Sequence, residues 1–157
     1  MTDDERGLAR LRTVADYQFG SGAGAALFPP DEPLEVRRTS SGRPQQVLAE
    51  DGRLVSHGID GRFTLALAGG RRIAAGLPAP AARVVVGDES EPFVREGRNA
   101  FAKFVDEVDP GVRPDDEVLV VHESGELLGV GRAELSADAM LDFGSGMAVK
   151  VREGAGE

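Results

Sequence analysis

The chain has 157 residues and no cysteine, so it can hold one domain or two small ones but no disulfide, thiolate metal ligand or cysteine nucleophile. Its 27 acidic and 18 basic residues give a net charge of -9, and its two histidines, His57 and His122, are too far apart in sequence for a histidine-rich metal motif. No apolar run approaches the ~20 residues that span a bilayer, and the acidic start Met1–Glu5 is unlike a signal peptide. We therefore expect a cytoplasmic protein with no membrane partner.

The first half of the chain has the pattern of a small α+β unit. Leu8, Leu11 and Val14 share one face of a helix that should end near Gly20. Further along, apolar residues recur at every second position, and the pair Asp51-Gly52 favours a tight hairpin. The expected elements in chain order are a helix capped by Thr2 or Asp3 that ends near Phe19-Gly20, a helical turn over 23–28, strands over 34–37, 45–49, 53–56 and 62–66, and a closing helix over 71–77. This order predicts helices followed by a three- or four-stranded antiparallel meander.

A glycine-rich segment, Gly20–Gly24, follows the first helix. A dinucleotide-binding loop needs a strand before it, and a phosphate-binding P-loop needs a lysine after it; neither condition holds here. We therefore expect no cofactor and interpret these glycines as small residues that let two helices cross closely.

Charge is distributed unevenly and changes at a proline-containing segment. Residues 1–78 carry ten basic and ten acidic residues, whereas residues 79–157 carry eight basic and 17 acidic ones. The change falls at Leu77–Ala82, which has two prolines and no charge and is typical of a short, stiff linker. The sequence therefore predicts two small domains, over residues 1–78 and 79–157.

The second half alternates short strands and short helices. A strand over 83–86 precedes a helix that starts around Asp88–Pro92, buries Phe93 and Val94, and ends at Gly97. Strands are expected over 99–107, 117–122, 126–135 and 147–152, with a helix over 137–143. This β-α-β-β-β-α-β order within ~70 residues, with glycines at the corners, predicts a small sheet curled into a β-pseudobarrel.

Four segments of this half, residues 91–105, 113–121, 125–133 and 146–152, resemble an archaeal PUA domain in the same order. In the first half, residues 14–23, 27–28 and 38–43 resemble the domain that precedes PUA in archaeosine tRNA-guanine transglycosylase and archaeosine synthase. The resemblance implies a pre-PUA-like α+β domain followed by a PUA pseudobarrel, the domain that grips the acceptor stem and 3′ end of tRNA in those enzymes. The catalytic barrel of the transglycosylase and its zinc ligands find no counterpart, so we expect no catalytic residue and no metal.

The Gly97-Arg98-Asn99 loop is the strongest candidate for RNA contact. Its backbone N–H groups can approach phosphate or ribose, Asn99 can read a base edge or a 2′-hydroxyl, and Phe101 or Phe104 can stack a base. Further cations on the same domain are expected to converge on one face. The predicted RNA-binding residues are Arg95, Gly97, Arg98, Asn99, Phe101, Lys103, Arg113, Arg132, Lys150 and Arg152.

The first half offers a different basic patch. Arg37, Arg38 and Arg43 surround one turn and can present positive charge to phosphates, or they can be the solvated face of a hairpin. Arg6 and Arg10, in the first helix, are expected to matter much less for RNA binding.

A predominance of arginine over lysine, 16 to two, accompanies the acidic composition. This pattern is typical of a salt-adapted, halophilic protein, although a GC-rich genome also favours arginine and alanine. Net negative charge normally argues against RNA binding, but fields are screened within ~3 Å at molar salt.

The sequence therefore predicts a non-catalytic RNA-binding protein that favours tRNA and docks it for a separately encoded tRNA-modifying enzyme. Two alternatives remain open. The PUA fold can instead serve as a protein-interaction scaffold, which the -9 charge of the second half favours, or as a translation-associated factor near the ribosome.

Overall fold

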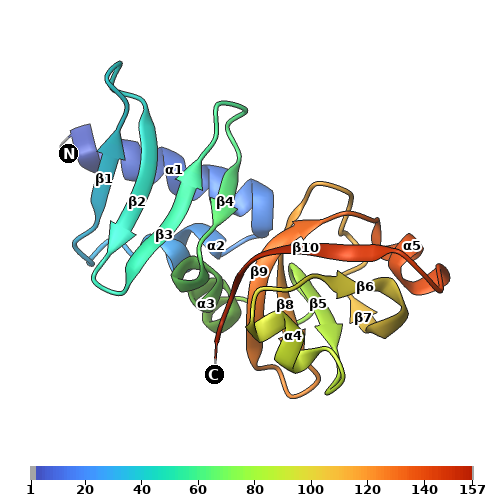
Figure 1. Ribbon diagram of the computed structural model, residues 1–157. Helices are drawn as coiled ribbons and strands as arrows, with labels where there is room; N and C mark the ends of the chain where they lie inside the picture. Colours follow the sequence, from blue (N-terminus) through green and yellow to red (C-terminus); the bar gives the residue numbers. More distant parts are fainter. Residues whose placement is uncertain (1–2, 157) are drawn as a thin grey trace. The chain divides into compact units, whose positions relative to one another are not determined.

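The computed structural model describes residues 3–156 of the chain (Figure 1). The chain divides into two compact units, Met1–Pro78 and Ala79–Glu157. Among the described residues, no helix combines the length and the apolar character that crossing a membrane requires.

The first unit is a four-stranded meander with three helices. Its sheet has the order β1-β2-β3-β4, and every neighbouring pair is antiparallel. The elements are α1 (Asp3–Phe19), α2 (Ala23–Leu27), β1 (Glu35–Arg38), β2 (Pro44–Ala49), β3 (Gly52–His57), β4 (Phe63–Leu65) and α3 (Leu67–Gly76). The predicted helices-then-meander order is confirmed, including the turn at Asp51-Gly52, where Gly52 has a φ of 119°.

Close packing of helices against their neighbours explains two glycines of this unit, Gly24 and Gly69. A Cβ on Gly24 would lie 2.3 Å from the carbonyl oxygen of Arg12, so only glycine lets α2 cross α1 this closely, as the sequence predicts. Helix α3 begins at Leu67 rather than at the expected residue 71. Its Gly69-Gly70 pair resembles a helix breaker, but a Cβ on Gly69 would lie 2.0 Å from the Leu54 oxygen of β3. The glycine is therefore needed for packing inside the helix.

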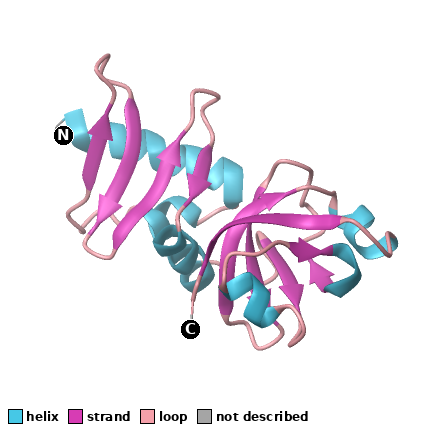
Figure 2. Cartoon of the chain, viewed as in Figure 1, coloured by secondary structure: helices cyan, strands magenta, loops and turns pink. Residues whose placement is uncertain are grey.

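The second unit is a curled six-stranded sheet (Figure 2). Its order is β6-β10-β9-β8-β5-β7, and β5 and β8 are its one parallel pair among the described residues. The elements are β5 (Arg83–Val86), α4 (Glu91–Arg95), β6 (Ala100–Phe101), a 3-10 turn η1 (Ala102–Phe104), β7 (Val105–Val108), β8 (Glu117–His122), β9 (Leu127–Ala133), α5 (Ala137–Asp142) and β10 (Met147–Gly154).

The predicted single strand over 99–107 is wrong in one respect that explains how the sheet closes. The segment is divided into β6 and β7, which stand at opposite edges of the sheet order and are joined by η1 alone. Because three residues connect the two edges, the sheet must curl back on itself into a nearly closed barrel. Ala102 is buried in η1 and donates its N–H to the Gly146 oxygen, which fixes this corner. The predicted pseudobarrel is thus confirmed.

Small apolar side chains fill the barrel. Its core consists mostly of valine and alanine, with Leu128 and Met140 as its largest fully buried members. On β9, a Cβ on Gly131 would lie 2.3 Å from the Lys150 oxygen of β10. This close approach places the outward-facing residues of β9 and β10 side by side.

Candidate nucleic-acid interface

A pocket lined by three phenylalanines lies beside α4 in the second unit. Its volume is about 520 Å³, and we call it the aromatic pocket. The turn before α4, the helix itself, the loop after it, β6 and η1 supply its lining, which consists of Glu89, Ser90, Phe93, Arg98, Asn99, Phe101 and Phe104. The structure therefore brings Arg98, Asn99 and Phe101, three of the residues predicted from the sequence, to one cavity.

The loop that carries Arg98 is a Schellman motif at the end of α4. Gly97 has a φ of 92°, a conformation that favours glycine, and its N–H donates to the Val94 oxygen at 2.9 Å. The N–H of Arg98 donates to the Phe93 oxygen at 2.9 Å. Because both amides cap α4, they are not available for the phosphate contact that the sequence predicts. Gly97 instead shapes the loop.

Closing the motif brings Arg98 over an aromatic ring. The Arg98 guanidinium carbon lies 5.8 Å from the centroid of the Phe93 ring, within reach of a cation–π contact. Lys103 makes a similar contact, with its Nζ 5.0 Å from the centroid of Phe104. Arg98 also pairs weakly with Glu96, at 3.5 Å, and both side chains are well exposed. Two cations thus stand over two of the rings that line the aromatic pocket.

The pocket presents phenylalanine to solvent. Phe93 is 49% exposed and Phe101 46% exposed, whereas Phe104 is half-buried. The expectation that Phe93 belongs to the buried face of its helix is therefore wrong, because a five-residue helix buries only Val94 on the sheet. A usable signal exists in the sequence: when Gly97 closes a Schellman motif, residue 93 is the helix position that meets residue 98.

Asn99 is anchored on the neighbouring strand. The Val151 N–H donates to Asn99 Oδ1 at 3.0 Å, which fixes the side-chain amide against β10. The remaining hydrogen-bonding capacity of Asn99 is chiefly that of its two Nδ2 donors. Such donors match acceptor groups on a base or ribose.

The other predicted cations do not converge on one face. Arg95 donates to Glu91 at 2.9 Å and to Glu126 at 2.6 Å, and these bonds raise its pKa, the Glu126 bond most. Glu126 immediately precedes β9, whereas Arg132 lies near the other end of that strand. Arg95 is therefore separated from the remaining cations and held by carboxylates.

Arg132, Lys150 and Arg152 form a second group, on β9 and β10. Lys150 on β10 lies directly opposite Arg132 on β9 in the register of the two strands. All three side chains are exposed. Carboxylates accompany two of them: Glu134 lies 3.1 Å from Arg132, and Glu117 accepts from Arg152. Arg113 is exposed in the turn before β8, where its backbone N–H donates to Asp116. These ion pairs reduce the positive charge that the group can offer to phosphate.

A cluster of acidic residues around His122 is not apparent from the sequence. His122 Nε2 lies 2.6 Å from Asp88 Oδ1 and 4.0 Å from Glu91 Oε1, and its Nδ1 lies 3.0 Å from Ser124 Oγ. The hydrogen bond to Asp88 raises the pKa of His122. The three ligand-type groups are close enough to hold a cation, but the hydrogen bond between the His122 ring and Asp88 already accounts for their arrangement. The parallel pairing of Val86 with His122 brings these distant residues together.

Two family models match this chain. Patch-forming domain C2 of tRNA-guanine transglycosylase matches residues 9–80, and the PUA domain matches residues 82–155. The tRNA-guanine(15) transglycosylase of Pyrococcus furiosus is 46% identical over 154 residues, which are 98% of this chain and 26% of that protein. The enzyme of the same name from Methanothermobacter thermautotrophicus is 44% identical over 148 residues, which are 94% of this chain and 22% of that protein. The chain thus spans about a quarter of the length of these relatives.

Solved structures share the fold. Hypothetical protein PH0734.1 from Pyrococcus horikoshii superposes with a TM-score of 0.75 at 21% identity, covering 98% of this chain and 92% of that one. A conserved PUA domain protein from Thermoplasma acidophilum superposes with a TM-score of 0.65 at 19% identity, covering 98% and 91%. Together with the family models, these findings confirm the resemblance predicted from the sequence. The chain thus carries a patch-forming domain C2 of the tRNA-guanine transglycosylase kind followed by a PUA domain.

Proposed function

We propose that this chain is a non-catalytic RNA-binding region that holds structured RNA, tRNA above all, for a tRNA-modifying enzyme. The observation that carries the proposal is the aromatic pocket, where exposed Phe93 and Phe101 stand beside Arg98 and Asn99. Exposed aromatic rings of this kind stack unpaired bases, which contributes ~1–3 kcal/mol per base.

The chemistry of the pocket favours an unpaired end over a duplex. Bases of a duplex hide their faces, whereas the single-stranded 3′ end of a tRNA offers both faces and edges. Phe101 and Phe93 supply stacking surfaces, Asn99 supplies amide donors, and Arg98 supplies charge already positioned over a ring. We expect Lys103, whose Nζ lies 5.0 Å from the centroid of the Phe104 ring, to meet the phosphates of an adjoining acceptor stem.

Kinship supports the same ligand. The relatives carry the name tRNA-guanine(15) transglycosylase. One of the two family models describes a domain of tRNA-guanine transglycosylase, and the other describes the PUA domain. Because this chain corresponds to about a quarter of those relatives, we assign the catalysis to other parts of such enzymes and the docking of tRNA to this region. The modifying enzyme can be encoded on the same chain or separately.

A titration of intact and 3′-trimmed tRNA tests the proposal. Phe101→Ala and Arg98→Ala should each weaken binding of intact tRNA by about tenfold, and trimming the 3′ end should have a similar effect. The matched control is Phe143→Ala, because Phe143 is 54% exposed on the same unit and does not line the aromatic pocket. Equal affinity of all three variants for both RNAs would place the RNA site elsewhere.

The scaffold alternative makes the opposite prediction. It draws support from the carboxylates that pair with Arg95, Arg132 and Arg152. If the folded protein binds no tRNA at any salt concentration, the RNA proposal fails and a protein partner becomes the better candidate.

A further inference from the structure

The turn before α4 adds two polar residues to the aromatic pocket that stacking alone does not use. Glu89 and Ser90 line the pocket together with Asn99, and we call these three residues the polar edge. Glu89 is exposed, whereas Ser90 is only 6% exposed. Arg98 is the one cation among the lining residues and Glu89 the one carboxylate, so their formal charges cancel. A pocket of this composition suits the edge of a base better than a phosphate group.

The Ser90 hydroxyl is not used by the helix that it precedes. Ser90 occupies the N-cap position of α4, where a serine side chain usually accepts a hydrogen bond from the first turn. Its φ of -87° and ψ of -22° are helical rather than extended, and its side chain makes no capping hydrogen bond. Its backbone groups are occupied, since its N–H donates to the Gly87 oxygen at 3.2 Å and its oxygen accepts from the Val94 N–H at 3.0 Å. The hydroxyl is therefore the group that Ser90 offers to a ligand in the pocket.

Hydrogen bonds on either side hold this turn in place. Asp88 Oδ1 lies 2.6 Å from His122 Nε2 at the end of β8, and Glu91 Oε2 accepts from Arg95 at 2.9 Å. The two residues between Asp88 and Glu91 are the ones that line the pocket. Asn99 is fixed in turn by the hydrogen bond that its Oδ1 accepts from β10. The polar edge is thus positioned before a ligand binds, which lowers the entropy cost of recognition.

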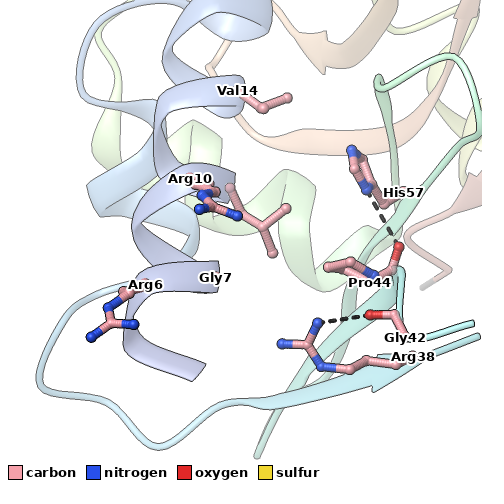
Figure 3. A pocket seen from close by; sticks show the side chains of 9 residues that line it. Arg6, Gly7, Arg10, Val14, Arg38, Gly42, Pro44 and His57 are labelled. Atoms are coloured by element: carbon pink, nitrogen blue, oxygen red, sulfur yellow. Dashed lines mark hydrogen bonds between the residues drawn. The ribbon is translucent and has the colours of Figure 1, made fainter. Parts of the chain in front are cut away.

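A cavity of about 730 Å³ in the first unit differs in this respect (Figure 3). There, Arg38 Nη1 donates to the Gly42 oxygen at 3.0 Å, and His57 Nδ1 lies 3.4 Å from the Pro44 oxygen. Both contacts, drawn as dashed lines in Figure 3, join segments of the meander. These two side chains therefore hold the hairpin together.

The arginine patch considered from the sequence is divided by the fold. Arg37 pairs with Glu35 at 2.9 Å, and Arg43 donates to the carbonyl oxygens of His57 and Gly58. Like Arg38, both arginines thus make contacts within the meander.

We propose, resting on the RNA-binding function proposed above, that the polar edge selects an unpaired cytosine or adenine over uracil, with the Glu89 carboxylate accepting from the amino group of the base. On the Watson–Crick edge of cytosine and adenine, that amino group adjoins a ring nitrogen that accepts a hydrogen bond. A carboxylate only accepts, and the Nδ2 group of Asn99 only donates, so the two together match such an edge. Uracil instead presents carbonyl oxygens on both sides of one N–H, and a carbonyl oxygen would oppose the carboxylate.

Two substitutions of one residue probe this selection by different routes. Glu89→Ala removes the acceptor, whereas Glu89→Gln keeps the shape and adds an amide donor that a uracil oxygen can accept. The matched control is Glu107→Ala, because Glu107 is exposed on β7 of the same unit and does not line the pocket. The control reports the general rise in RNA affinity that follows the loss of one negative charge. Circular dichroism establishes that each variant is folded.

The experiment is a titration of short RNA hairpins that differ only in an unpaired 3′ overhang. The overhang consists of adenosine, cytidine, uridine, purine riboside or 2-pyrimidinone riboside; the last two keep the rings of adenine and cytosine but lack the amino group. The unaltered chain and Glu107→Ala should bind the adenosine and cytidine overhangs about tenfold more tightly than the overhangs without an amino group. Glu89→Ala should reduce this ratio to about twofold or less, and Glu89→Gln should in addition raise affinity for the uridine overhang.

The outcomes separate this inference from the function on which it rests. If Phe101→Ala weakens binding but the unaltered chain shows no preference for amino groups, or Glu89→Ala keeps the preference, the polar edge does not select the base and the proposed function stands. If Glu89→Ala weakens binding of all overhangs equally, the carboxylate contacts ribose hydroxyls, and selection by the amino group is overturned. If the folded protein binds none of these RNAs and no tRNA, both proposals fail.

Discussion

Substitution of Arg152 tests whether this basic side chain stabilises the folded protein or binds RNA. It is one of the residues predicted to bind RNA, yet its two terminal nitrogens donate to the two carboxylate oxygens of Glu117. The Glu117 side chain is 6% exposed and that of Arg152 is 37% exposed. Loss of Arg152 would therefore leave a buried charge on Glu117 without its partner, whereas loss of the Glu117 charge would leave the Arg152 guanidinium in contact with water.

Arg152→Ala should destabilise the protein more than Glu117→Gln. Removing the arginine deprives a buried carboxylate of its ion pair, which costs about 3–5 kcal/mol for a fully buried pair. Because Arg152 is more than one-third exposed, solvent already screens the pair, and we reduce the expected loss to about 2 kcal/mol. Glu117→Gln retains shape and leaves a guanidinium that water reaches, so about 1 kcal/mol should be lost. Urea unfolding at pH 7 measures both.

The control is Lys150→Ala, two residues away and exposed on the same strand. It should change the free energy of unfolding by less than about 0.5 kcal/mol. Equal costs for Arg152→Ala and Glu117→Gln, or no cost for either, would refute the reasoning from burial. If Arg152→Ala weakened tRNA binding without loss of stability, Arg152 would serve RNA after all.

Three further predictions follow from the charge and chain geometry. The melting midpoint, followed by circular dichroism, should be higher at ~2 M than at ~0.1 M KCl, because salt screens the 17 acidic residues of the second unit; equal midpoints would remove the salt-adaptation interpretation. Limited proteolysis should be slow at Leu77–Ala82, since both end residues are buried, and rapid cutting there into two stable fragments would contradict this. The folded-state pKa of His122 is raised, so its contribution to stability is fully present below about pH 6.5 and is lost as the pH rises through the higher folded value. Asp88→Asn should lower that pKa in an NMR titration of the ring, and an unchanged titration would show that the Asp88 contact does not form in solution.

Local patterns were sufficient for much of the fold. The turn at Asp51-Gly52, the end of α4 at Gly97 and the alternating strands of the meander each depend on neighbours in sequence. The corner at Ala102 does not. Residues 99–107 have strand composition throughout, and only the demand that β6 and β7 join opposite edges of one sheet forces a turn there.

The candidate site divides in the same way. The loop of Gly97, Arg98 and Asn99 was predictable as a place of interest, because a glycine followed by a cation and an amide is a local pattern. The hydrogen bonds that its groups make could not be predicted, because they depend on the folded neighbours. The Gly97 and Arg98 amides cap α4, and Asn99 Oδ1 accepts from Val151 on β10. The ion pairs of the predicted cations were not predictable for a tertiary reason, since the carboxylate partners of Arg95 and Arg132 include residues from other strands and turns.

Salt should change which groups of the aromatic pocket contribute most to RNA affinity. Contacts of Arg98 and Lys103 with phosphate would depend on counterion release, which contributes little at molar salt. Stacking on Phe93 and Phe101 depends mainly on ring contact and on exclusion of water, which salt does not weaken in the same way. At molar salt the rings would therefore carry most of the affinity, and the two cations would contribute mainly when ionic strength falls. A net charge of -9 is compatible with such an interface, because stacking depends little on the charge of the unit that carries the rings.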